Sequence, residues 1–293
     1  MNNHDYYRIG EKSLFFIIII NTALFAVKFL SGLIGRSQAL IADSFHTAAD
    51  VLTSVAVLVG FFYASAPADA HHPYGHGKAE SVAAKIVSLT LIALGFKVIY
   101  DSSKILMLRE MFRPHQATLW VALLSIAVKE IQFRYALRYG KKIQSTSLIA
   151  DAWHHRSDMI SSVAALVGIA GARLGFGMLD PIAGIAVGIF VVKIGFNIFH
   201  TAFDELLDSA LPAEITDEIN KIAAETEGVK RVTVLKARKL GLEILVDMTI
   251  EVDKDMKVED AHLITAKIRR SVLKNISNAK DVLIHVEPYS GQM

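Results

Sequence analysis

Two short stretches of the sequence carry the same set of potential metal ligands. Residues 37–50 read SQALIADSFHTAAD, and residues 145–158, which begin 108 positions later, read STSLIADAWHHRSD. Each copy places a His and an Asp four positions apart, so on an α-helix both side chains lie on one face and reach the same point. The four residues are His46, Asp50, His154 and Asp158.

Two imidazole nitrogens and two carboxylate oxygens form a tetrahedral set of the kind that holds Zn²⁺. A bound ion would also neutralise two carboxylates that are costly in apolar segments. A single pair is equally well explained as a hydrogen bond on a helix surface, but the duplicated pair favours a metal site. Asp43 and Asp151 lie three residues before each His, where they can orient it, guide protons or interact with the helix dipole.

A further group of potential ligands lies between the two copies, in the Pro- and Gly-containing stretch PADAHHPYGHGKAES at residues 67–81. It contains Asp69, His71, His72 and His76. This density of His and Asp predicts a second metal site, and the alternative is a solvated loop whose His residues bind nothing.

The segments that carry these residues are too apolar for an average soluble domain. Of the 293 residues, 53% are hydrophobic and 20% charged, and the mean hydropathy is +0.40. A spanning helix needs about 20 mainly apolar residues. Six stretches meet this requirement: 13–35, 37–66, 81–107, 117–139, 145–174 and 180–203. They predict a membrane bundle of six helices.

Several of these predicted helices contain charged residues, which are rarely exposed to lipid. Lys28, Lys85, Lys129 and Glu130 therefore indicate a bundle with a polar interior, whereas Lys104 and Lys193 fit side chains that reach the interface. Six spans place both termini on one side. The short segments on that side carry seven Lys or Arg against five opposite, which predicts cytoplasmic termini.

The last 85 residues have a different composition: 27 of residues 209–293 are charged, against 33 of residues 1–208. We therefore predict a transport domain over 1–208 and a separate soluble domain over 209–293. Helical and alternating patterns follow one another in the order αββαβ, which predicts a small α+β domain. Its few potential ligands are Asp247, His262, His285 and Glu287. His285 and Glu287 share one face of the last strand.

Taken together, these features resemble the cation diffusion facilitator family of divalent-metal transporters. The resemblance rests on the paired H-x-x-x-D motifs, the GHGKAES signature at 75–81, LLDSALP at 206–212, the six predicted spans and the αββαβ tail. It implies a ferredoxin-like or metallochaperone-like cytoplasmic tail that binds metal and dimerises. It also implies that the transport site is the four-residue His and Asp set.

The resemblance extends to individual positions outside the predicted transport site. The family's loop site, D-x-x-H-x-x-x-H, corresponds to Asp69, His72 and His76, and its inter-protomer charge pair corresponds to Lys78 and Asp208. Thr233 and Thr249 stand where some members have His, which implies a reduced regulatory site made of Asp247, His262, His285 and Glu287.

The expected function is export of a divalent metal from the cytoplasm in exchange for protons. Metal and protons compete for neutral imidazole near its ordinary pKa of about 6.5. Two His and two Asp resemble the zinc-transporting branch of the family, and manganese, iron(II) and cobalt remain alternative substrates. We expect a homodimer in a bacterial or archaeal inner membrane, with the metal as substrate and possible regulator, and no prosthetic group.

Three other classes are weighed against transport. A membrane-bound metal sensor without flux fits the soluble tail but leaves the duplicated motif unexplained. An intramembrane metalloprotease would need an H-E-x-x-H motif, which is absent from the sequence, so no enzyme is expected. The net charge of +2 gives no reason to expect nucleic-acid binding. The absence of Cys excludes thiolate metal sites and thiol catalysis.

Overall fold

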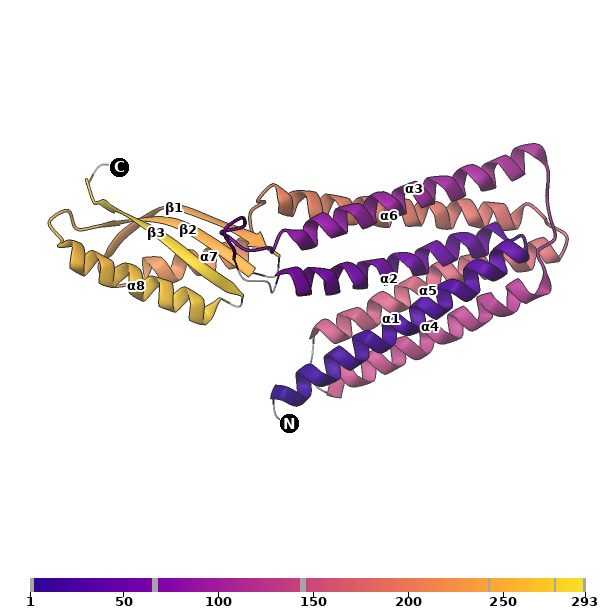
Figure 1. Ribbon diagram of the computed structural model, residues 1–293, viewed down its shortest axis with the longest axis horizontal. Coiled ribbons are helices and arrows are strands. Elements are labelled where there is room, and N and C mark those ends of the chain that lie inside the picture. The colour runs from indigo at the N-terminus through magenta and orange to yellow at the C-terminus, as the bar shows by residue number, and fades with distance from the viewer. Residues whose placement is uncertain (1–2, 65–67, 143–145, 242, 277, 292–293) are drawn as a thin grey trace. The chain divides into compact units, whose positions relative to one another are not determined.

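The computed structural model describes residues 3–64, 68–142, 146–241, 243–276 and 278–291 (Figure 1). The side chains of residues 3–17, 56–64, 139–142, 146–151, 154 and 155 lie outside this description, and those of Asp151 and His154 are therefore among the ones not described. Six long helices precede the tail in the described residues: α1 (Asn3–Ile34), α2 (Gln38–Ala64), α3 (Ala79–Leu108), α4 (Gln116–Lys142), α5 (Thr146–Arg173) and α6 (Leu179–Leu206).

Each of the six predicted apolar stretches falls on one of these helices. In the described part of the chain, α3 and α6 are long and apolar enough to cross a membrane by length and composition. Large apolar side chains such as Phe96 on α3 and Ile189 on α6 are more than half exposed, which fits helices that face lipid.

Close helix packing in this part of the chain depends on small residues. A Cβ added at Gly95 of α3 would lie 2.6 Å from Val192 of α6, and one added at Gly195 of α6 would lie 2.7 Å from Ile92 of α3. Figure 1 shows these two helices side by side. Small residues at helix interfaces let backbones approach closely, which increases van der Waals contact where the hydrophobic effect contributes little.

The tail forms the predicted αββαβ order. It consists of α7 (Ala213–Ala224), β1 (Val229–Leu240), β2 (Glu243–Val252), α8 (Val258–Asn275) and β3 (Ala279–Pro288). The sheet order is β1-β2-β3, with β1 antiparallel and β3 parallel to β2. Both helices cover one face of the sheet (Figure 1), where Val246, Met248 and Ile250 of β2 pack with Ile268 of α8 in the core. The alternate residues of β2 and β3 therefore lie on the opposite face.

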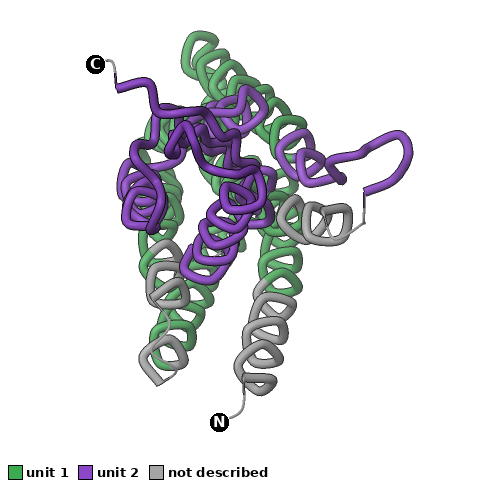
Figure 2. The backbone as a smooth tube through the Cα atoms, turned by 90° about the vertical axis from the view of Figure 1, so that its left-hand side faces the viewer, with its two compact units in different colours: residues 1–57, 84–199 green, residues 58–83, 200–293 purple. Residues whose placement is uncertain are grey.

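The chain separates into two compact units, coloured in Figure 2. One unit contains residues 1–57 and 84–199, and the other contains residues 58–83 and 200–293. The second unit thus contains the tail, the 68–78 loop and the neighbouring ends of α2, α3 and α6. The predicted division into 1–208 and 209–293 stays a prediction.

Candidate metal centre

Helix α2 is held at its start by two capping side chains. Ser37 Oγ accepts the backbone N–H of Leu40 at 3.1 Å, and Asp180 of α6 accepts the N–H of Gln38 at 2.7 Å and the hydroxyl of Ser37 at 2.6 Å. These contacts satisfy backbone donors that the first turn of a helix leaves unpaired. They set the position from which α2 presents its polar face.

Three of the four predicted transport ligands come together between α2 and α5. One ligand atom from each of His46, Asp50 and Asp158 lies within 4.8 Å of the others. The Nε2 of His46 is 3.4 Å from Asp158 Oδ1, and both side chains are nearly fully buried. The fourth predicted ligand, His154, is one turn before Asp158 on α5, and its side chain lies outside the described residues.

The buried imidazole of His46 has the environment of a ligand rather than of an ordinary core residue. Neither of its ring nitrogens makes a well-directed hydrogen bond within the described part of the chain. The ring lies 5.4 Å from that of Phe190 on α6, measured between centroids. Nε2 has the carboxylate of Asp158 nearby, whereas Nδ1 has no hydrogen-bond partner in the described part of the chain. A buried polar atom without a partner costs free energy, and a ligand would supply the missing bond.

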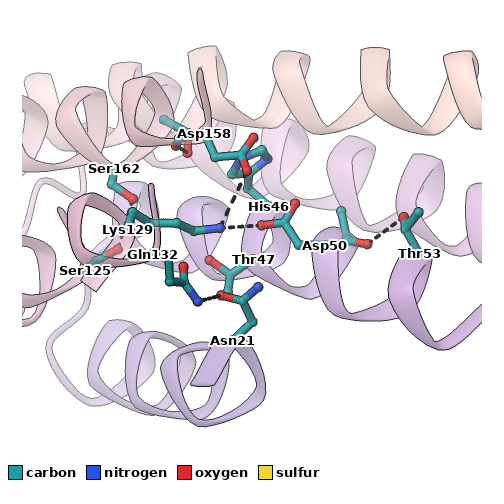
Figure 3. Close-up of polar contacts among 12 residues, drawn as sticks. Asn21, His46, Thr47, Asp50, Thr53, Ser125, Lys129, Gln132, Asp158 and Ser162 are labelled. Carbon is teal, nitrogen blue, oxygen red and sulfur yellow. Dashed lines mark hydrogen bonds and ion pairs between the residues drawn. The ribbon is translucent and has the colours of Figure 1, made fainter. Parts of the chain in front are cut away.

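A residue that the sequence did not single out as part of the site, Lys129 of α4, points into this group (Figure 3). Its Nζ donates to Asp50 Oδ2 at 2.7 Å and lies 3.6 Å from Asp158 Oδ2. The sequence did identify Lys129 as a charge facing a polar interior, and its burial fits that interpretation. Its contacts join α4 to Asp50 of α2 and to Asp158 of α5, so they depend on how the three helices pack.

A second buried ion pair lies beside the site. Lys28 of α1 and Asp43 of α2 are 2.7 Å apart, and both side chains are fully buried. Lys28 also donates to Thr47 and Ser162 at 2.9 and 3.2 Å, while Asp43 accepts hydrogen bonds from Ser161 and Ser162. The sequence suggested three roles for Asp43: orienting His46, guiding protons or interacting with the helix dipole. The structure shows a different one, because Asp43 neutralises a buried lysine.

The predicted loop ligands also lie together. One ligand atom from each of Asp69, His72 and His76 lies within 4.8 Å of the others. Asp69 Oδ1 accepts the backbone N–H groups of His72 and His71 at 2.6 and 2.8 Å, and its Oδ2 is 3.5 Å from His76 Nε2. The hydrogen bond from the His72 N–H lowers the pKa of Asp69 below its ordinary value, so the carboxylate is ionised and available to a cation.

The predicted charge pair forms within one chain. Lys78 Nζ lies 2.9 Å from Asp208 Oδ1, and Arg238 of β1 lies 3.3 Å from the other oxygen of Asp208. The hydrogen bond from Lys78 is the main reason why the pKa of Asp208 is lowered. Asp208 has a positive φ of 57°, a conformation that Asp tolerates better than most residues.

The four predicted tail ligands do not form one cluster in a single chain. His285 Nε2 lies 3.6 Å from Glu287 Oε1 on β3, as their shared strand face predicts. Asp247 is on the open face of β2, where its partner in register is Leu283, whereas His262 belongs to α8 on the covered side. His262 and Glu287 border one pocket, which does not include Asp247. The tail site stays a prediction.

Comparison with known proteins decides the family. Residues 14–207 match the cation efflux transmembrane domain, and residues 211–289 match the cytoplasmic domain of cation efflux proteins. The chain belongs to the cation diffusion facilitator family. This confirms the predicted family and fold class, and it makes the chain an integral membrane transporter that exports divalent metal cations rather than an enzyme.

Members of the cation diffusion facilitator family from several bacteria align with nearly the whole chain. The manganese efflux system protein MneP of Bacillus subtilis (strain 168) is 33% identical over 96% of this chain and 97% of its own length. The manganese efflux system protein MneS of the same organism is 30% identical over 98% and 99%. The magnetosome protein MamB of Magnetospira sp. (strain QH-2) is 31% identical over 95% of each chain.

Proposed function

We propose that the protein exports zinc from the cytoplasm in exchange for protons, through a transport site made of His46, Asp50, His154 and Asp158. The observation that carries the proposal is the buried convergence of His46, Asp50 and Asp158 from two helices. A mixed nitrogen and oxygen donor set suits Zn²⁺, and two carboxylates neutralise its charge. Protons and metal compete for the imidazoles, which couples the two fluxes when the site opens alternately to each side.

Manganese is a second candidate substrate, because two relatives that span the full length of this chain are named as manganese efflux proteins. Affinity alone does not decide between the metals. In the Irving–Williams order Mn²⁺ binds more weakly than Zn²⁺ to a given set of ligands, so a manganese exporter must select by geometry or by metal availability.

We further propose a homodimer in a bacterial or archaeal inner membrane, with both termini in the cytoplasm. Lys78 and Asp208, which pair within the chain, would brace the protomers near the membrane surface. Asp69, His72 and His76 would bind a second metal ion. Asp247, His262, His285 and Glu287 would form a weak regulatory site completed by dimerisation, because in one chain they lie on different sides of the sheet.

Metal flux into proteoliposomes under an imposed pH gradient tests the proposal. Zn²⁺, Mn²⁺, Fe²⁺ and Co²⁺ are presented separately and then in competition. Asp50→Ala should abolish flux, whereas the matched control Asp101→Ala, which removes an exposed carboxylate paired with Lys97 on α3, should not. Retained flux in a folded Asp50→Ala protein would contradict the site.

The same assay separates the remaining alternatives. A preference for Mn²⁺ in competition would keep the transport site and replace zinc. Flux that ignores the pH gradient would remove the proton exchange. Folded, inserted protein that moves none of the four cations would favour a membrane-bound sensor.

A further inference from the structure

Lys129 lies in the metal centre, but a lysine has no role as a ligand beside His and Asp. Its ammonium is buried and lies 2.7 Å from Asp50 and 3.6 Å from Asp158, the carboxylates proposed as ligands. In Figure 3 the side chain extends from α4 toward these two carboxylates. A permanent cation at this position opposes the binding of a second one.

Metal and ammonium compete for the same two carboxylates. Lys129 contacts Oδ2 of both Asp50 and Asp158, and Asp50 Oδ2 already accepts its hydrogen bond. A divalent ion held by these carboxylates would lie within a few ångströms of Nζ. In a buried site of low effective dielectric, like charges at that separation repel strongly. An ammonium that stays at this position therefore opposes occupancy of the site by the metal.

The other buried lysine shows what a permanently fixed ammonium looks like in this fold. Lys28 has a carboxylate at 2.7 Å and two hydroxyl acceptors, Thr47 and Ser162, so its three N–H donors are all used. Lys129 makes one hydrogen bond within the described residues, to Asp50, and is otherwise attracted by the charge of Asp158. Lys28 is thus fixed by its surroundings, whereas Lys129 is held mainly by the groups that a metal would take.

We propose that Lys129 is an internal counter-ion that exchanges with the transported metal. Its ammonium neutralises Asp50 and Asp158 when no metal is bound, moves aside on its flexible side chain when metal enters, and returns as metal leaves. The ammonium of Lys129 weakens metal binding and promotes release, so that a site with two carboxylates does not retain the metal and can complete the transport cycle. This inference rests on the proposed transport site.

Metal binding to the purified full-length protein in detergent tests this role, with Zn²⁺ as the probe and titration calorimetry as the readout. Lys129→Gln removes the ammonium that opposes the metal and keeps both carboxylates, so the affinity for Zn²⁺ should increase at least about tenfold. Lys129→Arg keeps the charge and can pair with both carboxylates, so it should bind Zn²⁺ no more tightly than wild type. The matched control Lys193→Gln removes an exposed lysine of α6 and should leave the affinity unchanged.

Thermal unfolding distinguishes exchange from a purely structural role. Without metal, Lys129→Gln should melt below wild type, and saturating Zn²⁺ should remove most of that difference. A structural ion pair would lower both melting temperatures alike. In proteoliposomes the variant should show a lower KM together with a lower maximal rate, because release becomes slow.

The outcomes separate this inference from the proposed site. The relevant signal is the component of Zn²⁺ binding that is lost in Asp50→Ala. If Lys129→Gln leaves the affinity of that component unchanged or lowers it, the counter-ion is overturned and the site stays intact. If no component of wild-type Zn²⁺ binding is lost in Asp50→Ala, both the counter-ion and the transport site are overturned, because only the loop and tail sites then bind metal. If Lys129→Gln does not fold, Lys129→Met carries the same expectation. Failure of both variants to fold even when purified with saturating Zn²⁺ would overturn the proposal, because metal should replace the ammonium.

Discussion

Removing Asp43 should destabilise the helical part of the protein strongly, because it leaves Lys28 buried without a counter-ion. At the 2.7 Å separation of Nζ and Oδ2, and with an effective dielectric of about 20, the attraction between the two charges is about 6 kcal/mol. Desolvation of the two ions costs several kcal/mol each and offsets most of this. The intact pair therefore contributes little net stability, whereas its one-sided loss costs about 3–5 kcal/mol.

The expected result for Asp43→Asn is a melting temperature lowered by roughly 10 °C, measured in detergent without metal by circular dichroism. The double variant Lys28→Met/Asp43→Asn removes both charges and should recover at least half of that loss. As a matched control, Asp101→Asn breaks the exposed pair with Lys97, also 2.7 Å long, and should cost less than about 1 kcal/mol.

Two results would refute this reasoning. In the first, Asp43→Asn melts at the same temperature as the wild type, which would mean that leaving the ammonium of Lys28 without its counter-ion costs no stability. In the second, the double variant melts below the wild type by the sum of the losses of Lys28→Met and Asp43→Asn. The two residues would then contribute to stability independently, and their charges would not compensate one another.

Three further predictions concern the other contacts. The pKa of Asp208 is lowered by Lys78, so its ion pair should stabilise the fold above the ordinary pKa of about 3.9. That contribution should be lost as the pH falls through the lower folded pKa. Unfolding curves of wild type and Lys78→Ala should therefore differ slightly at about pH 7 and approach one another as the pH falls below about 3.9. Gly95→Leu should separate α3 from α6, since even a Cβ there would lie 2.6 Å from a side-chain carbon of α6, and should lower the melting temperature by several degrees; an unchanged melting curve would contradict the close packing. Asp69→Asn should weaken Zn²⁺ binding in the loop without changing the affinity of the transport site, and calorimetry that finds the same number of bound ions in the variant would count against a loop site.

The sequence was most informative where a periodic pattern has a single structural solution. Apolar stretches of about 20 residues predicted the helices, and the αββαβ pattern predicted two consecutive strands. In the structure β1 and β2 pair around a turn at Gly241, which has the positive φ of 62° that Gly tolerates. The i, i+4 spacing of His46 and Asp50 likewise placed both on one helix face. These are local properties, so no knowledge of packing was needed.

The sequence was least informative about partners from different helices. It identified Lys28 and Lys129 as charges requiring a polar environment, but helical spacing alone does not say that Lys28 meets Asp43 or that Lys129 meets Asp50. The capping of α2 by Asp180, 142 residues away, carried no sequence signal either. A lone Asp at the start of an apolar helix is explained equally well by the helix dipole.

The sequence by itself determined the six apolar segments, the αββαβ tail, the duplicated His and Asp motif and, through them, the family. Each of these follows from spacing along the chain, which sets what a helix or strand presents on each face. Only the tertiary structure decided which faces meet: it joined His46 and Asp50 to Asp158, placed Lys129 against two of these ligands and matched Lys28 with Asp43. Such contacts depend on helix rotation and close packing, because a buried charge is tolerated only where another chain segment brings its counter-charge within a few ångströms.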